Sequence, residues 1–344
     1  MFQIILTALT AFVIVWLLGP LLIPVLQRLK PARPEREAEP EQPAPQKKKQ
    51  PQPPPKPPVP TMGGVMALAA VTVATLIFGL DGMEFALPAL VCVLALGVLG
   101  FIDDFMRAKS GEPTGLPDYQ KLLAELVIAI IVAVWAYRSP LIGSSLHLPF
   151  SGKEWDIGVW YVPLVIFVVF TQINAAQFTD GMDGLLTSVT MVYALFMIAI
   201  LAAMARIANQ NGELLLGENL TGTAVFSAAV AGASVGFLCF NAYPARVQAG
   251  SSGSLAFGGA VAMLAILSRS ILILPVMGFC FAASLGSVIL QALSRRREDG
   301  KRLFRAVPIH RHFELMGHPA PKIVSMYAIV TAALCAACLL FYLR

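Results

Sequence analysis

The sequence has very little charge for its length. Only 13% of its 344 residues are Asp, Glu, Lys or Arg, whereas about 25% is usual in a soluble globular domain. Apolar residues make up 57% of the chain, and the mean hydropathy is +0.73. This balance excludes a soluble, a secreted or a disordered protein, and it predicts an all-α, polytopic membrane protein.

Cysteines are also few, and their spacing does not build a metal site or a disulfide framework. All five lie in apolar runs, with no histidine ladder nearby. Cys335 and Cys338 form the one CxxC, but on an apolar final segment they are expected to be packing residues. The sequence therefore predicts neither a disulfide scaffold nor a zinc site.

Long apolar runs dominate what is present. A helix that crosses a bilayer needs about 20 mainly apolar residues, and the runs between turn and charge signals predict about ten such spans. They lie near residues 4–27, 62–80, 85–102, 121–137, 158–176, 184–205, 222–240, 254–268, 270–292 and 322–343. The first run is too long for a signal-peptide core and has no basic segment before it, so we expect it to be retained as a span.

The basic residues indicate the orientation. The formal net charge is +5, but Lys and Arg are confined to the loops beside the spans, so we expect no nucleic-acid partner. The loops after the odd-numbered spans hold 20 of the 25 Lys and Arg residues, and the opposite side holds 5. Positive loops stay in the cytoplasm. We therefore expect both termini on the outer side.

Residues 31–60 differ from the rest of the chain. They hold 12 of the 25 prolines, three consecutive lysines and a Glu-rich stretch. Such a composition cannot form a packed core, so the segment is expected to be a disordered, partly polyproline-II cytoplasmic loop. We expect it to act as a spacer rather than as a docking site.

Polar residues gather at the predicted cytoplasmic ends of several spans. Asp103 and Asp104 follow one run, Asp180 and Asp183 another, and a Gly/Ser stretch and two histidines follow later. Acidic residues inside or beside membrane spans are costly unless they are used. Carboxylates together with substrate phosphates are the usual ligands of Mg²⁺, and Gly/Ser loops suit phosphate groups. The pattern predicts phosphoryl chemistry on a nucleotide-linked substrate at the cytoplasmic membrane surface.

Six motifs, in this order along the chain, resemble those of the phospho-N-acetylmuramoyl-pentapeptide transferase family. They are Thr61-Met62-Gly63-Gly64, Gly100-Phe101-Ile102-Asp103-Asp104-Phe105, Thr179-Asp180-Gly181-Met182-Asp183-Gly184-Leu185, Gly236-Phe237-Leu238-Cys239-Phe240-Asn241, Gly253-Ser254-Leu255-Ala256-Phe257-Gly258-Gly259 and Pro308-Ile309-His310-Arg311-His312-Phe313-Glu314. The broader superfamily of polyprenyl-phosphate N-acetylhexosamine-1-phosphate transferases shares the aspartate motifs. The first and last motifs favour the muramoyl-pentapeptide branch. The resemblance covers nearly the whole chain, so we expect one transferase domain over residues 1–344.

The resemblance implies a reaction and its partners. The expected activity is transfer of phospho-MurNAc-pentapeptide from UDP to undecaprenyl phosphate, which gives lipid I and UMP in peptidoglycan synthesis. The expected cofactor is Mg²⁺, and the expected place is the bacterial cytoplasmic (inner) membrane. UDP-MurNAc-pentapeptide, undecaprenyl phosphate, membrane lipids and a second copy in a homodimer are the expected partners.

The resemblance also implies roles for individual residues. The catalytic set is Asp103, Asp104, Asp180, Asp183 and His310, with Asp103 and Asp104 at the lipid phosphate. The substrate-binding set is Lys56, Lys121, Asn174, Gln177, Asn241, Gln248, Arg311 and His312. The metal set is Asp180, Asp183 and the position of Ser251. Lys121 has an alternative interpretation as an ordinary lysine at the end of a span that reaches for water.

Five positions depart from the family pattern, all around the expected cleft. Ser251 stands where the family has a magnesium-binding aspartate, and Gln248 where it has a phenylalanine that packs on uracil. Gln177, Arg311 and Ser284 replace an asparagine, a histidine and a glutamate. A neutral hydroxyl is a poor ligand for a hard cation, so the ion could shift to Asp180 or Asp183, or Arg311 could supply charge.

Three functional interpretations follow from these departures. The first is a divergent but active member of the family. The second is a related sugar-1-phosphate transferase that uses another UDP-sugar. The third is a catalytically silent membrane paralogue that acts as a scaffold through its proline-rich loop.

Overall fold

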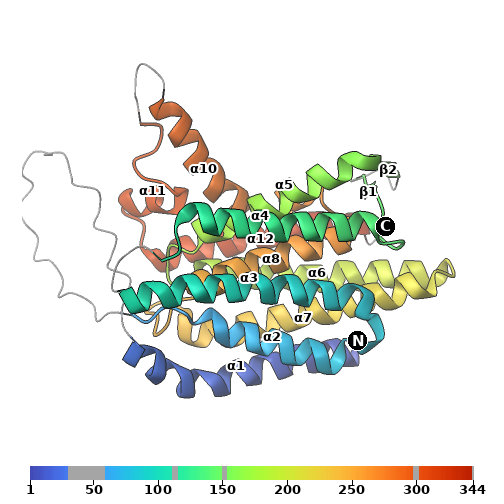
Figure 1. Cartoon of the computed structure of the whole chain (residues 1–344), viewed down its shortest axis with the longest axis horizontal. Coiled ribbons are helices and arrows are strands. Elements are labelled where there is room, and N and C mark those ends of the chain that lie inside the picture. The colour runs from blue at the N-terminus through green and yellow to red at the C-terminus, as the bar shows by residue number, and fades with distance from the viewer. Residues whose placement is uncertain (30–58, 111–114, 149–152, 297–301, 343–344) are drawn as a thin grey trace, which may run out of the picture.

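The structure is a computed structural model that describes residues 1–29, 59–110, 115–148, 153–296 and 302–342. It is an α-helical bundle in which most long helices run nearly parallel to one axis (Figure 1). The proline-rich segment predicted to be disordered lies almost entirely outside the described residues, which resume at Val59.

The described helices and strands follow in chain order. They are α1 (Phe2–Leu29), α2 (Gly64–Phe78), η1 (Leu80–Gly82), α3 (Met83–Ser110), α4 (Asp118–Arg138), β1 (Ser145–His147), β2 (Glu154–Asp156), η2 (Gly158–Trp160), α5 (Tyr161–Thr179), α6 (Leu185–Gln210), α7 (Leu214–Asn241), α8 (Gly250–Leu267), α9 (Leu274–Met277), α10 (Phe279–Arg295), α11 (Ile309–Leu315) and α12 (Ala320–Tyr342).

Eight of these helices are long and apolar enough to cross a membrane, and two shorter apolar helices, α2 and α10, stand where two further spans were predicted. Lipid can satisfy no backbone polar group, so helices are the expected way for this chain to span a bilayer. Helix α8 is entirely buried, whereas α1, α4 and α12 expose most of their apolar windows. The chain is therefore an all-α, polytopic membrane protein with α8 at the centre of the bundle.

Small residues let the helices around α8 approach closely. Helix α8 packs against α3 and α5, and α7 packs against α1 and α6. A Cβ added at Gly100 of α3 would collide with the backbone of Ser251, and one added at Gly64 would collide with the backbone of Gly253. Contacts this close need glycine at the crossing point, as is common between membrane helices.

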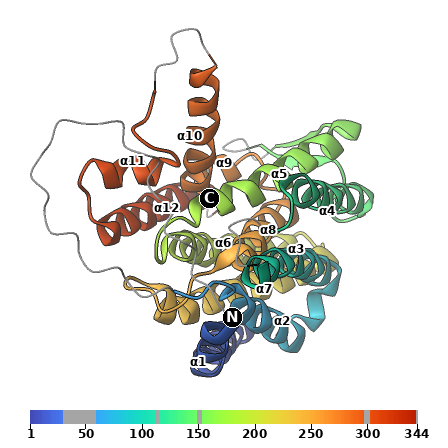
Figure 2. The ribbon, with the colours of Figure 1, turned by 60° about the vertical axis from the view of Figure 1, so that its left-hand side comes forward.

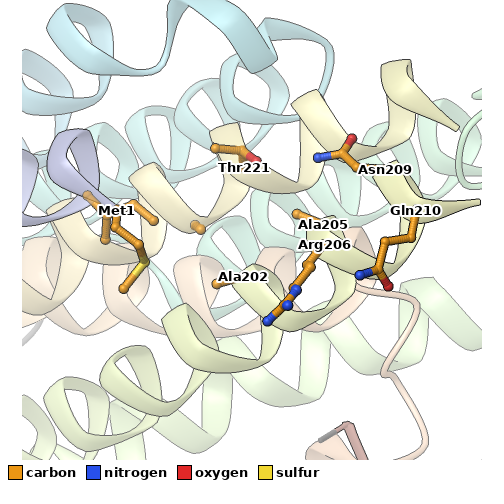
Figure 3. A pocket seen from close by; sticks show the side chains of 9 residues that line it. Met1, Ala202, Ala205, Arg206, Asn209, Gln210 and Thr221 are labelled. Carbon is orange, nitrogen blue, oxygen red and sulfur yellow. The ribbon is translucent and has the colours of Figure 1, made fainter. Parts of the chain in front are cut away.

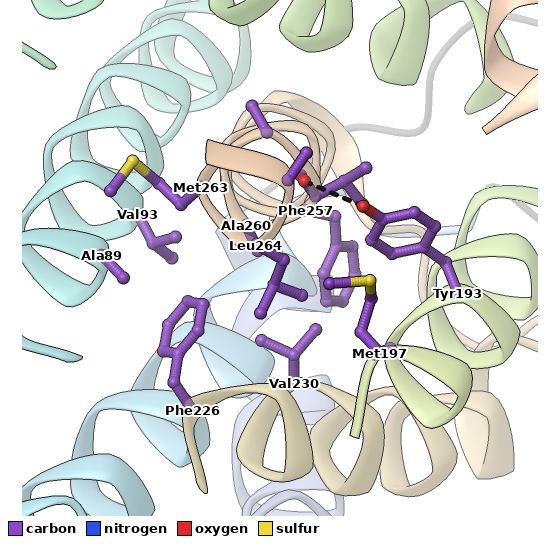
Figure 4. Close-up of a cluster of buried hydrophobic side chains, with 14 of the residues drawn as sticks. Ala89, Val93, Tyr193, Met197, Phe226, Val230, Phe257, Ala260, Met263 and Leu264 are labelled. Atoms are coloured by element: carbon purple, nitrogen blue, oxygen red, sulfur yellow. Dashed lines mark hydrogen bonds between the residues drawn. The ribbon is translucent and has the colours of Figure 1, made fainter. Parts of the chain in front are cut away.

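Larger side chains fill the space farther along α8. Figure 4 shows Phe257 and Leu264 of α8 gathered with Met197, Phe226 and Val230 from α6 and α7. Tyr193 of α6 donates its hydroxyl to the carbonyl of Val261 at 3.4 Å, so the one polar tip drawn in this cluster has a partner (Figure 4).

Two of the expected spans differ clearly from the observed helices. Helix α3 continues through Asp103 and Asp104 to Ser110, because nothing at the end of the apolar run breaks a helix. The expected span 270–292 is divided at Gly278 into α9 and α10. Pro275 lies in the first turn of α9, where its missing N–H costs nothing. Helix α10 then projects from the bundle (Figures 1 and 2).

A short antiparallel hairpin was not predicted. Strands β1 and β2 pair Ser145 with Asp156 and His147 with Glu154. Arg269 ties the hairpin to the bundle by contacting Glu154 at 3.1 Å and by donating to the carbonyl of Leu141 at 2.6 Å. Strands of three residues are too short to show an alternating pattern of apolar and polar residues, so they could not be predicted from the sequence.

Candidate functional site

The acidic motifs of the sequence meet at one end of the bundle. The last turns of α3 and α5, the start of α8 and the short helix α11 lie there. The start of α1 and the end of α12 lie at the opposite end, with the connection between α6 and α7 (Figure 1).

Asp104 caps the central helix. Its carboxylate accepts hydrogen bonds from the backbone N–H groups of Ser251 and Ser252 at 3.0 and 2.9 Å, and from the hydroxyl of Ser252 at 3.1 Å. The N-terminus of a helix presents unpaired N–H groups and partial positive charge, both of which favour a carboxylate. Gly250 has a φ of +70°, which glycine adopts without strain. Asp104 therefore fixes the start of α8 to α3.

Asp103 sits in the densest set of polar contacts. It is fully buried and accepts from the hydroxyl of Ser251 at 2.6 Å and from the backbone N–H of Leu116 at 3.0 Å. Arg107 and Lys121 contact the same carboxylate at 3.0 and 3.4 Å. Two cations, one from α3 and one from α4, thus share one carboxylate.

Lys121 does not behave as a lysine that reaches for water. It is 9% exposed and its ammonium group lies against Asp103. A lysine that snorkels keeps its charged end in the aqueous phase. The contact with Asp103 favours the interpretation of Lys121 as part of the polar cluster.

A second buried carboxylate, Glu125, lies one helical turn after Lys121. It accepts from the side-chain amides of Asn174 and Gln177 of α5, each at 2.9 Å. Sequence reasoning selected both amides but missed Glu125. Its spacing of four residues from Lys121, which places the two on one face of α4, was a signal that could have found it.

Asp180 and Asp183 flank the turn between α5 and α6. Both are half-buried, and Asp180 occupies the C-cap of α5. Asp183 accepts from the backbone N–H of Ala245 at 3.1 Å, which joins this turn to the loop after α7. Gly184 turns the chain with a φ of +76°. The carboxylates are close in sequence and partly open to solvent.

His310 lies against that turn. It is fully buried, and neither ring nitrogen has a hydrogen-bond partner among the described residues. A Cβ on Gly181 would collide with Nε2 of His310, so the ring faces the backbone between the two aspartates. Burial, helped by the charge of Arg311, lowers the pKa of His310 to about 3. The ring is therefore neutral at pH 7 and can both accept and donate a hydrogen bond.

The remaining sequence-selected residues have mainly structural contacts. Asn241 accepts from Thr187 at 2.8 Å and donates to the carbonyl of Val247 at 3.0 Å. The backbone of Gln248 pairs with Pro60 and Gly63 at 2.9 Å each, which brings the Thr-Met-Gly-Gly motif to the start of α8.

Two residues of the histidine motif are held within their own segment. Arg311 pairs with Glu314 at 3.2 Å, and Nδ1 of His312 accepts from the backbone N–H of Arg305 at 3.1 Å. Phe304 and Phe313 lie edge-on to the His312 ring. Lys56 lies outside the described residues.

Two cavities lie away from this cluster. One of about 400 Å³, lined by Met1, Arg206 and Asn209 among others, opens at the opposite end of the bundle (Figure 3). Another of about 1120 Å³ lies between the hairpin, the turn from α6 to α7 and the end of α12. Within the described ranges, no group of three or more His, Cys, Asp or Glu side chains is arranged to hold a metal ion.

Comparison with known proteins shows the family to which the chain belongs. A model of glycosyl transferase family 4 matches residues 86–269. The chain is 34% identical to the phospho-N-acetylmuramoyl-pentapeptide-transferase of Clostridioides difficile, over 95% of this chain and 94% of that protein. The enzymes of the same name from Clostridium kluyveri and Clostridium novyi are 36% and 38% identical, over 97% and 96% of this chain and 98% and 94% of theirs. The chain therefore belongs to glycosyl transferase family 4 and, within it, to the phospho-N-acetylmuramoyl-pentapeptide transferase family.

Proposed function

We propose that the protein transfers phospho-MurNAc-pentapeptide from UDP to undecaprenyl phosphate, releasing UMP. The observation that carries the proposal is the similarity, over almost the full length of both chains, to proteins named for this transferase activity. Both substrates carry negatively charged phosphate groups, which Arg107 and Lys121 of the site can contact. We propose that the site faces the cytoplasm at the bacterial inner membrane. The support is the count of basic residues, since 20 of 25 lie in the loops on the same side as the site.

In this reaction a phosphate oxygen of the lipid attacks the sugar-bound phosphorus of the nucleotide-sugar. A new P–O bond forms, the bond from that phosphorus to the bridging oxygen breaks, and UMP leaves with the bridging oxygen. Phosphoryl transfer depends mainly on positioning and on neutralising negative charge. Arg107 and Lys121, which contact Asp103 at 3.0 and 3.4 Å, are the cations proposed to meet the lipid phosphate.

His310 is proposed to act beside the transferring group. It is neutral and buried against the turn that carries Asp180 and Asp183. A neutral imidazole can accept a hydrogen bond from a phosphate hydroxyl or a water and donate one from its N–H group. Asp104, whose oxygens are bonded to the start of α8, is proposed to contribute by holding that helix in place.

Mg²⁺ is proposed as the cofactor, held by Asp180 and Asp183 together with substrate phosphates. Two half-buried carboxylates fit this ion, which is commonly bound by one or two carboxylates plus phosphate oxygens. Ser251 fits it poorly, because a neutral hydroxyl is a weaker ligand for a hard cation than a carboxylate. When bound, the ion would offset pyrophosphate charge.

One assay tests the proposal. Purified protein is given UDP-MurNAc-pentapeptide and undecaprenyl phosphate, with and without Mg²⁺, and UMP release is measured. Asp103→Asn, Asp180→Asn and Asp183→Asn should each lower turnover at least ~100-fold, the lower range for losing a positioned acid-base group. Asp81→Asn, an exposed aspartate at the other end of the bundle, is the matched control.

Other outcomes would point elsewhere. Release of UMP only with a different UDP-sugar would make the protein a related sugar-1-phosphate transferase. No release with any of them, from folded protein, would favour a silent paralogue. The homodimer stays a prediction, to be checked by the mass of the detergent-solubilised protein.

A further inference from the structure

Glu125 is a buried carboxylate to which the proposed reaction assigns no role. It lies on α4 with no exposed surface, at the level where α4 faces α5. Oε2 accepts from Nδ2 of Asn174 and Oε1 accepts from Nε2 of Gln177, each at 2.9 Å. Both oxygens of Glu125 are therefore used, and both partners are side chains that the family resemblance selected for substrate binding.

These contacts fix which way the two amides point. A carboxylate can only accept hydrogen bonds, so the NH₂ group of each amide must face Glu125. Nδ2 of Asn174 also donates to the carbonyl of Phe170 at 2.8 Å, which uses its second hydrogen. What Asn174 can offer to a substrate is therefore its carbonyl oxygen, and the amide oxygen of Gln177 likewise points away from Glu125.

Glu125 also lies within the charged part of the site. It is one turn from Lys121, which contacts Asp103 of α3, and Gln177 is three residues before Asp180. Asn174 and Gln177 are half-buried, so part of each side chain is accessible. The carboxylate thus joins the last two turns of α5 to α4 immediately before the turn that carries the proposed reaction.

We propose that Glu125 is a positioning residue that turns the amide oxygens of Asn174 and Gln177 toward the substrate, where they accept from a hydroxyl or N–H group of the nucleotide-sugar. This inference rests on the proposed function. Two acceptor oxygens repel phosphate, so the pair is matched to the hydrogen-bond donors of the substrate and leaves phosphate to Arg107 and Lys121. A donor of this kind exists on the ribose and base and on the sugar-peptide part.

The test compares Glu125→Gln with an exchanged pair. In Glu125→Gln the new side chain has one acceptor oxygen, so one of the two amides loses its partner and turns over. Affinity for the nucleotide-sugar should fall about 10-fold or more, the effect of one misdirected hydrogen bond, while the KM for undecaprenyl phosphate stays unchanged. In the double variant Glu125→Gln with Gln177→Glu, the amide at residue 125 donates to the carboxylate at residue 177 and still accepts from Asn174. The second oxygen of the carboxylate at residue 177 then faces the substrate, as the amide oxygen of Gln177 does in the wild type. It should recover most of the affinity.

Binding of UMP and of the full nucleotide-sugar is measured by calorimetry, and turnover is measured separately as UMP release. The melting temperature of every variant is measured as well. Glu218→Gln, an exposed glutamate at the far end of α7, is the control and should match the wild type. Weaker binding of both UMP and the full substrate would place the donor on the nucleotide. Weaker binding of the full substrate alone would place it on the sugar-peptide part.

The outcomes separate this inference from the proposed function. If the wild type releases UMP and Glu125→Gln binds the nucleotide-sugar as tightly as the wild type does, the inference is wrong and the function stands. A loss that the exchanged pair does not recover, accompanied by a lower melting temperature, would make Glu125 a structural residue only. If the wild type binds the nucleotide-sugar but does not turn over, the function fails while the binding series still decides the role of Glu125.

Discussion

At the scale of single residues, Ser251 decides how the charges of the site are arranged. Its hydroxyl donates to the buried carboxylate of Asp103 at 2.6 Å, a contact that a second carboxylate could not make. With an aspartate at residue 251 the two negative charges would face each other, and only a cation between them would make that favourable. Because Ser251 is neutral, it adds no negative charge beside Asp103 and contacts it by a hydrogen bond. The charge of Asp103 is then balanced by Arg107 and Lys121.

This contact predicts the effect of Ser251→Asp. In the absence of Mg²⁺ the variant should melt at a lower temperature than the wild type, because two buried carboxylates repel each other. Added Mg²⁺ should raise its melting temperature more than that of the wild type. Ser251→Asn introduces a side chain of the same size as aspartate but without its charge. Mg²⁺ should therefore not raise its melting temperature more than that of the wild type. Loss of a wild-type Mg²⁺ response in Ser251→Ala would instead mean that the serine itself is a ligand.

His310 predicts a dependence of stability on pH. Burial lowers its pKa from 6.5 to about 3, so the unfolded chain binds more protons than the folded protein between these values. The contribution of His310 is therefore complete above pH 6.5 and is lost as the pH falls toward 3. Between pH 6.5 and 5 this loss amounts to about 2 kcal/mol for one group.

The measurement is the unfolding of detergent-solubilised protein at pH 7 and pH 5, for the wild type and for His310→Gln. The variant should lose less stability between the two pH values. His147, whose pKa is also lowered by burial, contributes equally in both proteins and cancels in the comparison. Equal losses in the two proteins would mean that His310 is hydrated or hydrogen-bonded in solution.

At the scale of helices, the crossing of α3 and α8 sets the geometry of the cluster. Gly100 brings the two backbones together one turn before Asp103, and the next residues make the hydrogen bonds to Ser251 and Ser252. A helix without side chains at its crossing point can place its polar residues directly against the start of another helix. The cap of α8 and the contacts of Asp103 therefore depend on one glycine.

Gly100→Ala should disturb both helices. The new methyl group would collide with the Ser251 backbone, and overpacking of this kind costs typically 1–3 kcal/mol. Because α3 and α8 must separate, we expect a lower melting temperature together with a large loss of UMP release. Gly286→Ala on α10, where an added Cβ meets nothing within 4 Å, is the control. A Gly100→Ala protein with wild-type stability and turnover would show that the crossing tolerates a wider separation.

At the scale of the whole molecule, the polar cluster and the chain ends lie at opposite ends of the bundle (Figure 1). The proposed UDP-sugar substrate is cytoplasmic, so the proposed function requires the cluster to face the cytoplasm and the ends to face outward. The distribution of basic residues, with 20 of 25 on one side, favours the same orientation.

The orientation can be tested with reporter fusions after residues 296 and 344. Alkaline phosphatase should be inactive after residue 296 and active after residue 344, and a fluorescent protein should give the opposite pattern. Phosphatase activity at residue 296 would place the cluster on the outer face and contradict the proposed function as well as the topology.

The amino-acid sequence was sufficient to predict a helical membrane protein and to identify its family. Apolar runs of sufficient length specify helices in a bilayer, because every backbone polar group must be satisfied within the segment. Ordered motifs with fixed spacing, such as Asp180-Gly181-Met182-Asp183, identified the family that the comparisons confirmed. An apolar run and a short motif each involve residues that are neighbours along the chain, so both can be recognised without knowing the fold.

Which polar residues meet depends on how the helices pack. Asp103 and Ser251 are separated by 148 residues, and Asn174 and Glu125 by 49, so no periodicity along the chain links them. Glu125 lies outside the motifs and was not selected from the sequence. Asp104 was indistinguishable from Asp103 until one was found capping α8 and the other holding two cations. Hydrogen bonds and ion pairs act over a few ångströms, and it is the packing of α3, α4, α5 and α8 that brings these groups within that range.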